Sequence, residues 1–488
     1  MNELHLGRCL GAVSPQAFRR VQKERLLQSL KPSSLSFGFQ VQPESINVVS
    51  TASRGHLSDS QLAQVHPVAH GAGVNVLAID QNDGRYLLSG GADSTVRLWD
   101  LENVNETTSS QILGPAASLT KSRAGSHTHA LTSISIYPFD PTPTMFLSTA
   151  YDKTLRLTSI TPTSLEPGHT FPFEYVPFTH ALSPIPSHSV LVAVGTAHPA
   201  VRLLDLRSGL ATHSLPGHNG AVYSLSWSPR LDHILASGAA DGRVLFFDIR
   251  RAQSAFATLD LDDAIGVVAP DHTPEYKGRR PLDWNMRAHG GPVTGLRWMP
   301  AGDKVVTTGH DQRIRVWDTA TGRNDLVHFG PRIRNARNTE FAPLISPAGF
   351  GRTGKETLLW ANDDNRGEIF MFSLREGSML RTLKTPGVAR GPAQARAADA
   401  APGRFNSVGR INAMAWRCNA AAGGGVEMYS AHGDGSIHCW TGLLADGDEE
   451  IETKVDVAFQ ESERKRKRNR DLVSDLVEGL IKRPATSM

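Results

Sequence analysis

The sequence predicts an all-β fold, a seven-bladed β-propeller, with a helical segment before it and a charged tail after it. Two observations lead to this prediction. Units of similar sequence recur along the chain, and within each unit apolar and polar residues alternate with the period of two expected of half-buried strands. A single unit cannot bury both of its faces, so the units must stack around a ring. Seven is a common number of units in a closed ring of this kind.

Three copies of the unit are clear, at residues 69–100, 217–248 and 288–318. In each copy an aspartate follows a histidine by 22 or 23 residues, and an aromatic residue follows the aspartate by six. These signature residues are His70, Asp93 and Trp99; His218, Asp241 and Phe247; and His289, Asp311 and Trp317. The spacing is typical of the blades of WD40 propellers.

Four weaker copies complete the predicted ring, at 148–159, 192–209, 358–374 and 428–440. The first keeps Asp152 but has Thr158 at the aromatic position, and the last carries Asp434 and Trp440 six residues apart. With these copies, the blades are expected to begin near residues 69, 127, 175, 217, 288, 335 and 408.

The repeated histidines and aspartates are residue types that also serve in catalytic and metal sites. Here every strong copy carries them, so they are interpreted as a signature of the fold, in which the aspartate accepts hydrogen bonds from the histidine and from turn amides. The sequence has no nucleophile elbow and no HExxH motif. We therefore expect a protein that is not an enzyme and binds no metal or cofactor.

Composition limits the functional classes. The 488 residues carry a formal net charge of only +3, which gives no global field toward nucleic acid or membranes. The three cysteines, Cys9, Cys418 and Cys439, lack CxxC spacing, which argues against a disulfide framework or a structural zinc site. No apolar run approaches the ~20 residues of a membrane helix. A reducing intracellular compartment is expected.

The predicted boundaries divide the chain into an N-terminal helical segment and linker (1–60), the propeller (61–445) and a charged tail (446–488). Loop insertions are expected near 101–126, 251–286, 330–356 and 383–407. The last of these is rich in alanine, proline, glycine and arginine, a composition that predicts disorder.

The N-terminal segment carries helix signals over residues 14–32. Ser14 suits an N-cap and Pro15 the first helical position, and Lys31-Pro32 is expected to end the helix. Apolar residues recur at approximately helical spacing: Phe18, Val21, Leu26, Leu27 and Leu30. Two interpretations are open, since the helix can fold back onto its own propeller or dock another protein.

The tail contains ESERKRKRNRD (461–471), a basic run followed by a short stretch with helical periodicity. Its basic residues are Arg464, Lys465, Arg466, Lys467, Arg468 and Arg470. Such a run predicts a nuclear import signal or a contact with nucleic acid, and the alternative is a disordered or partly helical, solvated tail. A nuclear localisation is expected from it.

Beyond the repeats, the chain resembles the Cockayne syndrome group A family over most of residues 14–440. The resemblance is strongest over 83–103, 180–209, 215–252 and 286–330, and it includes the tryptophan-free copy at 192–209. It implies a non-catalytic substrate receptor of a cullin-four RING ubiquitin ligase in transcription-coupled nucleotide excision repair. The insertion at 251–286, the loop at 383–407 and the basic tail depart from the family pattern.

The resemblance also implies partners and contact residues. Receptors of this class carry a WDxR box, which is matched here by Asp248 with Arg250 and by Asp205 with Arg207. The implied contacts of the N-terminal helix with the ligase's DNA-damage-binding adaptor are Phe18, Arg19, Val21, Leu26 and Leu27. A guanidinium suits such an interface because it donates several coplanar hydrogen bonds.

Further implied partners are a helicase-like ATPase of the Cockayne syndrome group B type and the stalled RNA polymerase II machinery, with no small-molecule ligand and no membrane. The alternative is a WD40 scaffold that binds nucleic acid or chromatin proteins directly through its basic tail and loops, without a ligase. Direct contact with DNA stays open. Binding of nucleic acid through the tail would weaken steeply with salt and would survive the loss of Arg250. Adaptor binding would depend little on salt and would be lost with Arg250.

Overall fold

The computed structural model describes residues 10, 12–39, 68–103, 112–186, 190–251, 255–261, 266–267, 286–347, 350, 356–386, 409–417 and 426–442. The chain divides into two compact units, Met1–Gly442 and Leu443–Met488. The second unit, which contains the basic run 464–470, lies outside the described residues, as do Cys9 and Cys418.

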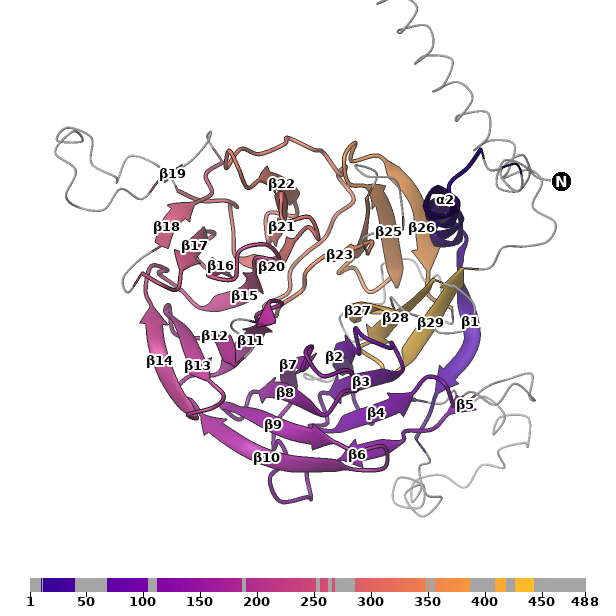
Figure 1. The fold of residues 1–488 in the computed structure, drawn as a ribbon, viewed down its shortest axis with the longest axis vertical. Helices are drawn as coiled ribbons and strands as arrows, with labels where there is room; N and C mark the ends of the chain where they lie inside the picture. The colour runs from indigo at the N-terminus through magenta and orange to yellow at the C-terminus, as the bar shows by residue number, and fades with distance from the viewer. Residues whose placement is uncertain are drawn as a thin grey trace, which may run out of the picture. The chain divides into compact units, whose positions relative to one another are not determined.

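The strands of the first unit form seven sheets arranged as a ring, so the predicted seven-bladed propeller is confirmed (Figure 1). Blade 1 contains β2 (Val74–Ile79), β3 (Tyr86–Gly91), β4 (Val96–Asp100) and β6 (Ala117–Leu119). Blade 2 contains β7 (Leu131–Ile136), β8 (Met145–Ala150), β9 (Thr154–Ile160) and β10 (Leu165–Pro172). Blade 3 contains β11 (Pro177–Leu182), β12 (Leu191–Thr196), β13 (Val201–Asp205) and β14 (Leu210–Leu215).

Blade 4 contains β15 (Val222–Trp227), β16 (Ile234–Ala239), β17 (Val244–Asp248), β18 (Ala255–Thr258) and β19 (Gly266–Val267). Blade 5 contains β20 (Val293–Trp298), β21 (Lys304–Gly309) and β22 (Ile314–Asp318). Blade 6 contains β23 (Leu344–Ile345), β24 (Thr357–Ala361), β25 (Glu368–Ser373) and β26 (Met379–Lys384). Blade 7 contains β27 (Ile411–Arg417), β28 (Glu427–His432) and β29 (Ile437–Gly442), joined by β1 (Leu30–Phe37) and β5 (Ile112–Leu113).

The N-terminal strand β1 closes the ring. It pairs antiparallel with β29, with Leu30 opposite Gly442, and parallel with β5. Residues 30–37 are therefore a strand, not the helix end and linker that the sequence indicated. The preceding helix α2 (Pro15–Gln28) ends early, where the Ser29 hydroxyl donates to the Leu26 carbonyl at 3.1 Å.

Tryptophans on the innermost strands tie neighbouring blades together. The indole of Trp227 donates to the Ala181 carbonyl at 3.0 Å, and that of Trp298 donates to the Ser226 carbonyl at 3.1 Å. Trp416 donates in the same way to Ile345 at 3.0 Å. In each pair the donor and the acceptor lie on the innermost strands of adjacent blades, so the ring is held by directional bonds as well as by apolar packing.

Segments predicted as loop insertions supply parts of the blades. The expected insertion 330–356 contains β23, and its residues Ile333, Phe341 and Leu344 are buried in the core. The insertions at 101–126 and 251–286 contain β5 with β6 and β18 with β19, respectively. Single strands of two to four residues carry too little periodicity to be detected in sequence. Parts of the four expected insertions lie outside the described residues, namely 104–111, 252–254, 262–265, 268–285, 348–349, 351–355 and 387–407.

Candidate protein-interaction site

In blades 1 and 5 the signature residues form a buried hydrogen-bonded relay. In blade 5, His289 lies 2.9 Å from Asp311 through Nδ1 and 2.8 Å from the Thr307 hydroxyl through Nε2. The Trp317 indole donates to the same Thr307 hydroxyl at 2.9 Å. In blade 1, His70, Asp93, Ser89 and Trp99 form the same relay.

The electrostatics and the burial of the relay indicate a structural role. Burial lowers the pKa of His289, and Asp311 opposes this shift. Burial also opposes ionisation of Asp311, but the hydrogen bond from His289 and the nearby Arg315 guanidinium outweigh it and hold the pKa of Asp311 well below its usual range. The side chain of His289 has no exposed surface, so no substrate reaches it. This geometry supports a structural role.

The other blades carry parts of the relay. In blade 2, His127 contacts Asp152 and Ser148, each at 2.9 Å, and Thr158 stands in place of the indole. In blade 4, His218 contacts Asp241 at 3.3 Å and Ser237 at 2.7 Å. Phe247 fills the tryptophan position of blade 4 and is fully buried, but it has no N–H to donate.

Blade 7 uses a different histidine. The Trp440 indole donates to Ser430 at 2.9 Å, and His432, which lies on the strand itself, contacts Ser430 at 2.9 Å. Asp434 accepts from the backbone and hydroxyl of Ser436 instead of from a histidine.

Sequence reasoning missed the hydroxyl at the centre of each relay. It stands four residues before the signature aspartate, as Ser89, Ser148, Ser237, Thr307 and Ser430. This repeated position was the signal that could have found it, because a buried hydroxyl needs a fixed partner.

Arg250 lies at the turn after β17 and is presented to solvent by a short ion pair. Its Nε and Nη2 donate to the two carboxylate oxygens of Asp248 at 3.0 and 2.8 Å, and its backbone N–H donates at 3.1 Å. The hydrogen bonds from Arg250 outweigh the opposing effect of burial and lower the pKa of Asp248 to about 2. Asp248 is buried, whereas 63% of the Arg250 side chain is exposed. The guanidinium is thus oriented and still accessible.

The corresponding pair in blade 3 is looser. Arg207 is exposed and donates its backbone N–H to Asp205 at 2.9 Å. Within the described part of the chain its guanidinium forms no ion pair. The two boxes therefore lie at equivalent turns of blades 3 and 4, with only the second pre-oriented.

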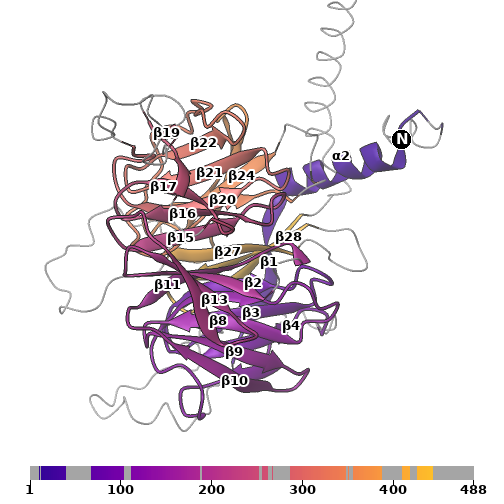
Figure 2. The ribbon, with the colours of Figure 1, turned by 60° about the vertical axis from the view of Figure 1, so that its left-hand side comes forward.

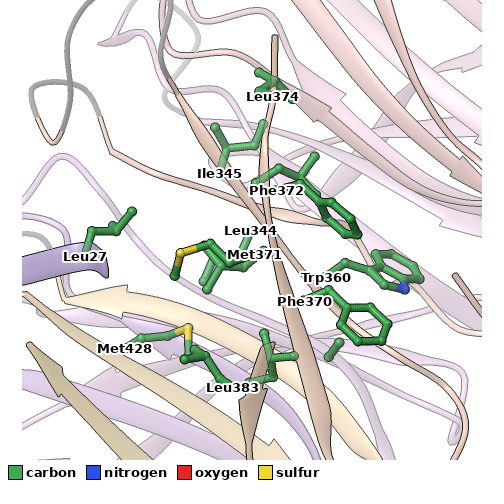
Figure 3. Packing of buried hydrophobic residues seen from close by; sticks show 14 of the residues in the cluster. Leu27, Leu344, Ile345, Trp360, Phe370, Met371, Phe372, Leu374, Leu383 and Met428 are labelled. Atoms are coloured by element: carbon green, nitrogen blue, oxygen red, sulfur yellow. The ribbon is translucent and has the colours of Figure 1, made fainter. Parts of the chain in front are cut away.

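Helix α2 is anchored at one end. Leu26 and Leu27 are buried in a cluster with residues of blades 5, 6 and 7, and Figure 3 shows Leu27 beside the methionines and leucines of this cluster. These two leucines are used by the chain's own core and are unavailable as direct contacts for a partner. The fold-back interpretation therefore holds for this end of the helix, because both leucines are buried in the cluster and α2 contacts β29.

The opposite end of α2 is more exposed. Ala17 and Arg20 are exposed, Phe18 and Val21 are half-buried, and the side chain of Arg19 is outside the described residues. Figure 2 shows this end projecting beyond the blades. The helix is thus anchored by the two leucines at its C-terminal end, and its N-terminal half is accessible.

The central channel holds a polar groove of about 380 Å³. Glu340, from the segment before β23, accepts a hydrogen bond from the buried Thr179 hydroxyl of blade 3. Burial raises the pKa of Glu340 to about 7, although Thr179 and Arg297 oppose the shift. No group of three or more His, Cys, Asp or Glu side chains that could hold a metal ion is found among the described residues. In the same residues, no helix has the length and apolar character needed to cross a membrane.

Comparison with known proteins agrees with this architecture. The family model described as "WD domain, G-beta repeat" matches residues 62–100, 120–159, 209–248 and 282–318. The chain is a WD40 repeat protein. The four matches cover blades 1, 2, 4 and 5, which are the blades in which the His–Asp contact is present.

Several curated proteins are similar to this WD40 chain. The WD repeat-containing protein ATCSA-1 of Arabidopsis thaliana is 27% identical over 57% of the chain and 73% of its own length. Histone acetyltransferase type B subunit 2 of Debaryomyces hansenii is 27% identical over 53% of the chain and 59% of its own length. The ribosome biogenesis protein ytm1 of Aspergillus terreus is 26% identical over 52% of the chain and 54% of its own length.

Proposed function

We propose that the protein is a non-catalytic substrate receptor that joins a cullin-RING ubiquitin ligase, through its DNA-damage-binding adaptor, to proteins of transcription-coupled repair. The resemblance to the Cockayne syndrome group A family and the similarity to ATCSA-1 support this proposal. The observation that carries it is Arg250: a guanidinium held in place by a buried carboxylate and still mostly exposed.

The adaptor contact combines two elements of the chain. The Arg250 guanidinium keeps donors free after pairing with Asp248, so it can bind a carbonyl or carboxylate of the adaptor. The exposed N-terminal half of α2 supplies a second contact, and its anchored end fixes the direction in which it projects. Because both contacts are already held in place, less conformational entropy is lost when the adaptor binds.

The mechanism is proximity. A receptor bound to the adaptor holds its client near the ubiquitin-loaded enzyme and raises the effective concentration of the client's lysines. The proposed clients are repair and transcription proteins at stalled RNA polymerase II, including the helicase-like ATPase, and the proposed compartment is the nucleus.

A second candidate is a scaffold for chromatin proteins without a ligase. The similarity to a histone acetyltransferase type B subunit favours it. Adaptor capture distinguishes the two candidates, because only the receptor requires it.

The test is capture of the purified adaptor by the full-length chain and by the variants Arg250→Ala, Arg207→Ala and Arg20→Glu. The proposal expects Arg250→Ala to weaken capture more than ~10-fold and Arg207→Ala to weaken it less, since Arg207 is not pre-oriented. Arg251→Ala is the matched control, because Arg251 is also exposed and lies within 3.7 Å of Asp248. Folded wild-type protein that captures no adaptor would exclude the receptor function.

Substitutions on α2 are preferable to deleting the N-terminal segment. Removing β1 would take away the outer strand of blade 7, and loss of capture would then report an open ring instead of a lost contact. Arg20 is exposed, so Arg20→Glu changes the surface and leaves closure intact.

A further inference from the structure

Blade 5 has an incomplete outer edge. Among the described residues it has three strands, whereas every other blade has at least four. After β22 the chain makes one bridge, between Trp317 and Asn324, which is formed by the bonds from the Asp318 N–H to the Arg323 carbonyl at 2.9 Å and from the Asp325 N–H to the Val316 carbonyl at 2.8 Å. It then leaves the edge at Leu326, which is 83% exposed with φ 55°.

The register shows which backbone groups are left open. Bonds from Gly309 N–H to the Arg313 carbonyl and from Thr319 N–H to the Asp303 carbonyl direct the odd-numbered residues of β22 toward β21. Ile314 therefore directs its N–H and C=O away from β21. Neither group has a hydrogen-bond partner in the described part of the chain.

A groove of about 450 Å³ lies at this open edge. It is lined by residues 311–315, by Asn324, residues 326–331 and Ile333 of the segment that follows, and by Leu261. Leu261 and Leu326 offer apolar surface, 37% and 83% exposed. The groove thus occupies the place of a fourth strand and offers both backbone and apolar contacts.

The charge along the groove is positive. Arg313 is exposed and forms no ion pair with any described residue, and the Arg334 guanidinium donates to Gln312 at 2.7 Å beside it. The neighbouring carboxylates are already used, Asp311 by Arg315 and Asp325 by Lys304. A strand with acidic residues at the Arg313 end therefore complements this edge.

We propose that the edge of β22 binds an extended acidic segment of a partner protein by β-strand addition. The segment lies antiparallel to β22, as the fourth strands of other blades do, and exchanges both backbone hydrogen bonds with Ile314. Its acidic residues follow this position and meet Arg313. Because this edge is separate from Arg250 and α2, the inference goes beyond adaptor binding and stands without it.

The pairing of blade 3 supplies a probe. There Leu215 at the end of β14 (LATHSL) lies opposite Val201, the first residue of β13, and Ile314 is the first residue of β22. The probe is the acetylated, fluorescein-labelled peptide LATHSLDD, whose last leucine would face Ile314 and whose aspartates would face Arg313. The matched control peptide is N-methylated at that leucine, which removes one N–H and leaves every side chain unchanged.

Fluorescence anisotropy with the full-length chain tests the proposal. We expect the probe to bind, the N-methylated peptide to bind at least ~10-fold more weakly, and Arg313→Glu to weaken binding ~5-fold with a loss of salt dependence. Arg250→Ala should leave probe binding unchanged, so this result is independent of adaptor capture.

Three results would overturn the proposal. The N-methylated peptide could bind as tightly as the probe, which would exclude backbone pairing. The probe could bind only to a chain in which 268–285 is replaced by a glycine-serine linker, which would make the chain's own insertion the occupant. Absence of binding to both proteins would mean that the edge accepts no strand.

Discussion

Blades 4 and 5 are neighbours with similar sequences, yet they differ in two places. Blade 5 has the full relay through Trp317, whereas blade 4 has Phe247, and among the described residues its Ser237 hydroxyl bonds to His218 alone. At the outer edge blade 4 is the more complete of the two. It has β18 and β19 beyond β17, whereas β22 of blade 5 is left largely open.

The two blades show that the contacts which stabilise the inner strands are independent of the surface at the outer edge. In both blades the contacts between histidine, aspartate and hydroxyl and a buried aromatic residue hold the inner three strands, although only Trp317 donates to the hydroxyl. The outer edge depends on the segment after the third strand. In blade 4 this segment begins with the exposed Arg250 and forms β18 and β19, whereas in blade 5 it leaves β22 largely open. Differences at the edge leave the inner strands unchanged, so the edge is where neighbouring blades can acquire different partners.

The largest effect should come from His218→Ala. It leaves the fully buried Ser237 hydroxyl without its hydrogen-bond partner, and we expect a loss of about 3 kcal/mol in the free energy of unfolding by urea denaturation. His289→Ala should cost about 1 kcal/mol less, because Thr307 keeps Trp317 and Asp311 keeps Arg315. Equal losses would contradict this difference between the relays.

Exchanging the aromatic residues tests the contribution of the indole N–H to the relay. Trp317→Phe should cost about 2 kcal/mol, because it removes the donor to Thr307 and leaves a cavity in a buried site. Phe247→Trp should change stability by less than about 1 kcal/mol, since a new bond to Ser237 offsets the crowding of a fully buried site. A large gain in the second variant would show that blade 4 is incomplete.

A smaller effect is expected where blade 5 lines the channel. Arg297 stands on β20 where blade 4 has Ser226, and it faces Glu340, whose pKa is raised to about 7. A raised pKa gives stability at low pH that is lost as pH rises from about 4.5 through 7. Glu340→Gln keeps an acceptor for Thr179 and should remove this decline, making the variant about 1 kcal/mol more stable at pH 8. Parallel pH profiles of melting temperature would refute this role for Glu340.

The smallest effect on stability should come from Arg250→Ala. The guanidinium is mostly exposed, so solvent screens its ion pair with Asp248 and the pair should contribute little to the free energy of unfolding. The melting temperature should stay within a degree or two of wild type. A marked fall in melting temperature would make Arg250 a structural residue of blade 4.

The sequence predicted the inner part of the propeller well. The interval between histidine and aspartate is a contact in the fold, so it repeats wherever that contact is made. Of the four blades in which it occurs, blades 1, 4 and 5 were the clear copies in the sequence and blade 2 was a weaker one. The outer strands were not predicted, because β1 and β18 are selected by an open edge in space and not by a local pattern.

The candidate site divides in the same way. Arg250 follows Asp248 by two residues, so the sequence was sufficient to identify this pair. The difference between Arg250, whose guanidinium bonds to Asp248, and Arg207, whose backbone N–H bonds to Asp205, depends on side-chain geometry. The helix was predicted, but the burial of Leu26 and Leu27 against the chain's own propeller was left open as one of two interpretations, since helical spacing alone does not say which surface covers the apolar face.

The position of β1 also dictates the order of events during synthesis. The strand that completes the last blade leaves the ribosome before the other described strands, and it finds its partner only after β29 has been made. In the interval the growing chain is an open arc with two unpaired edges, a state in which chaperones are most needed. A truncation before Gly442 and a deletion through Phe37 therefore have the same physical outcome, an arc that cannot close.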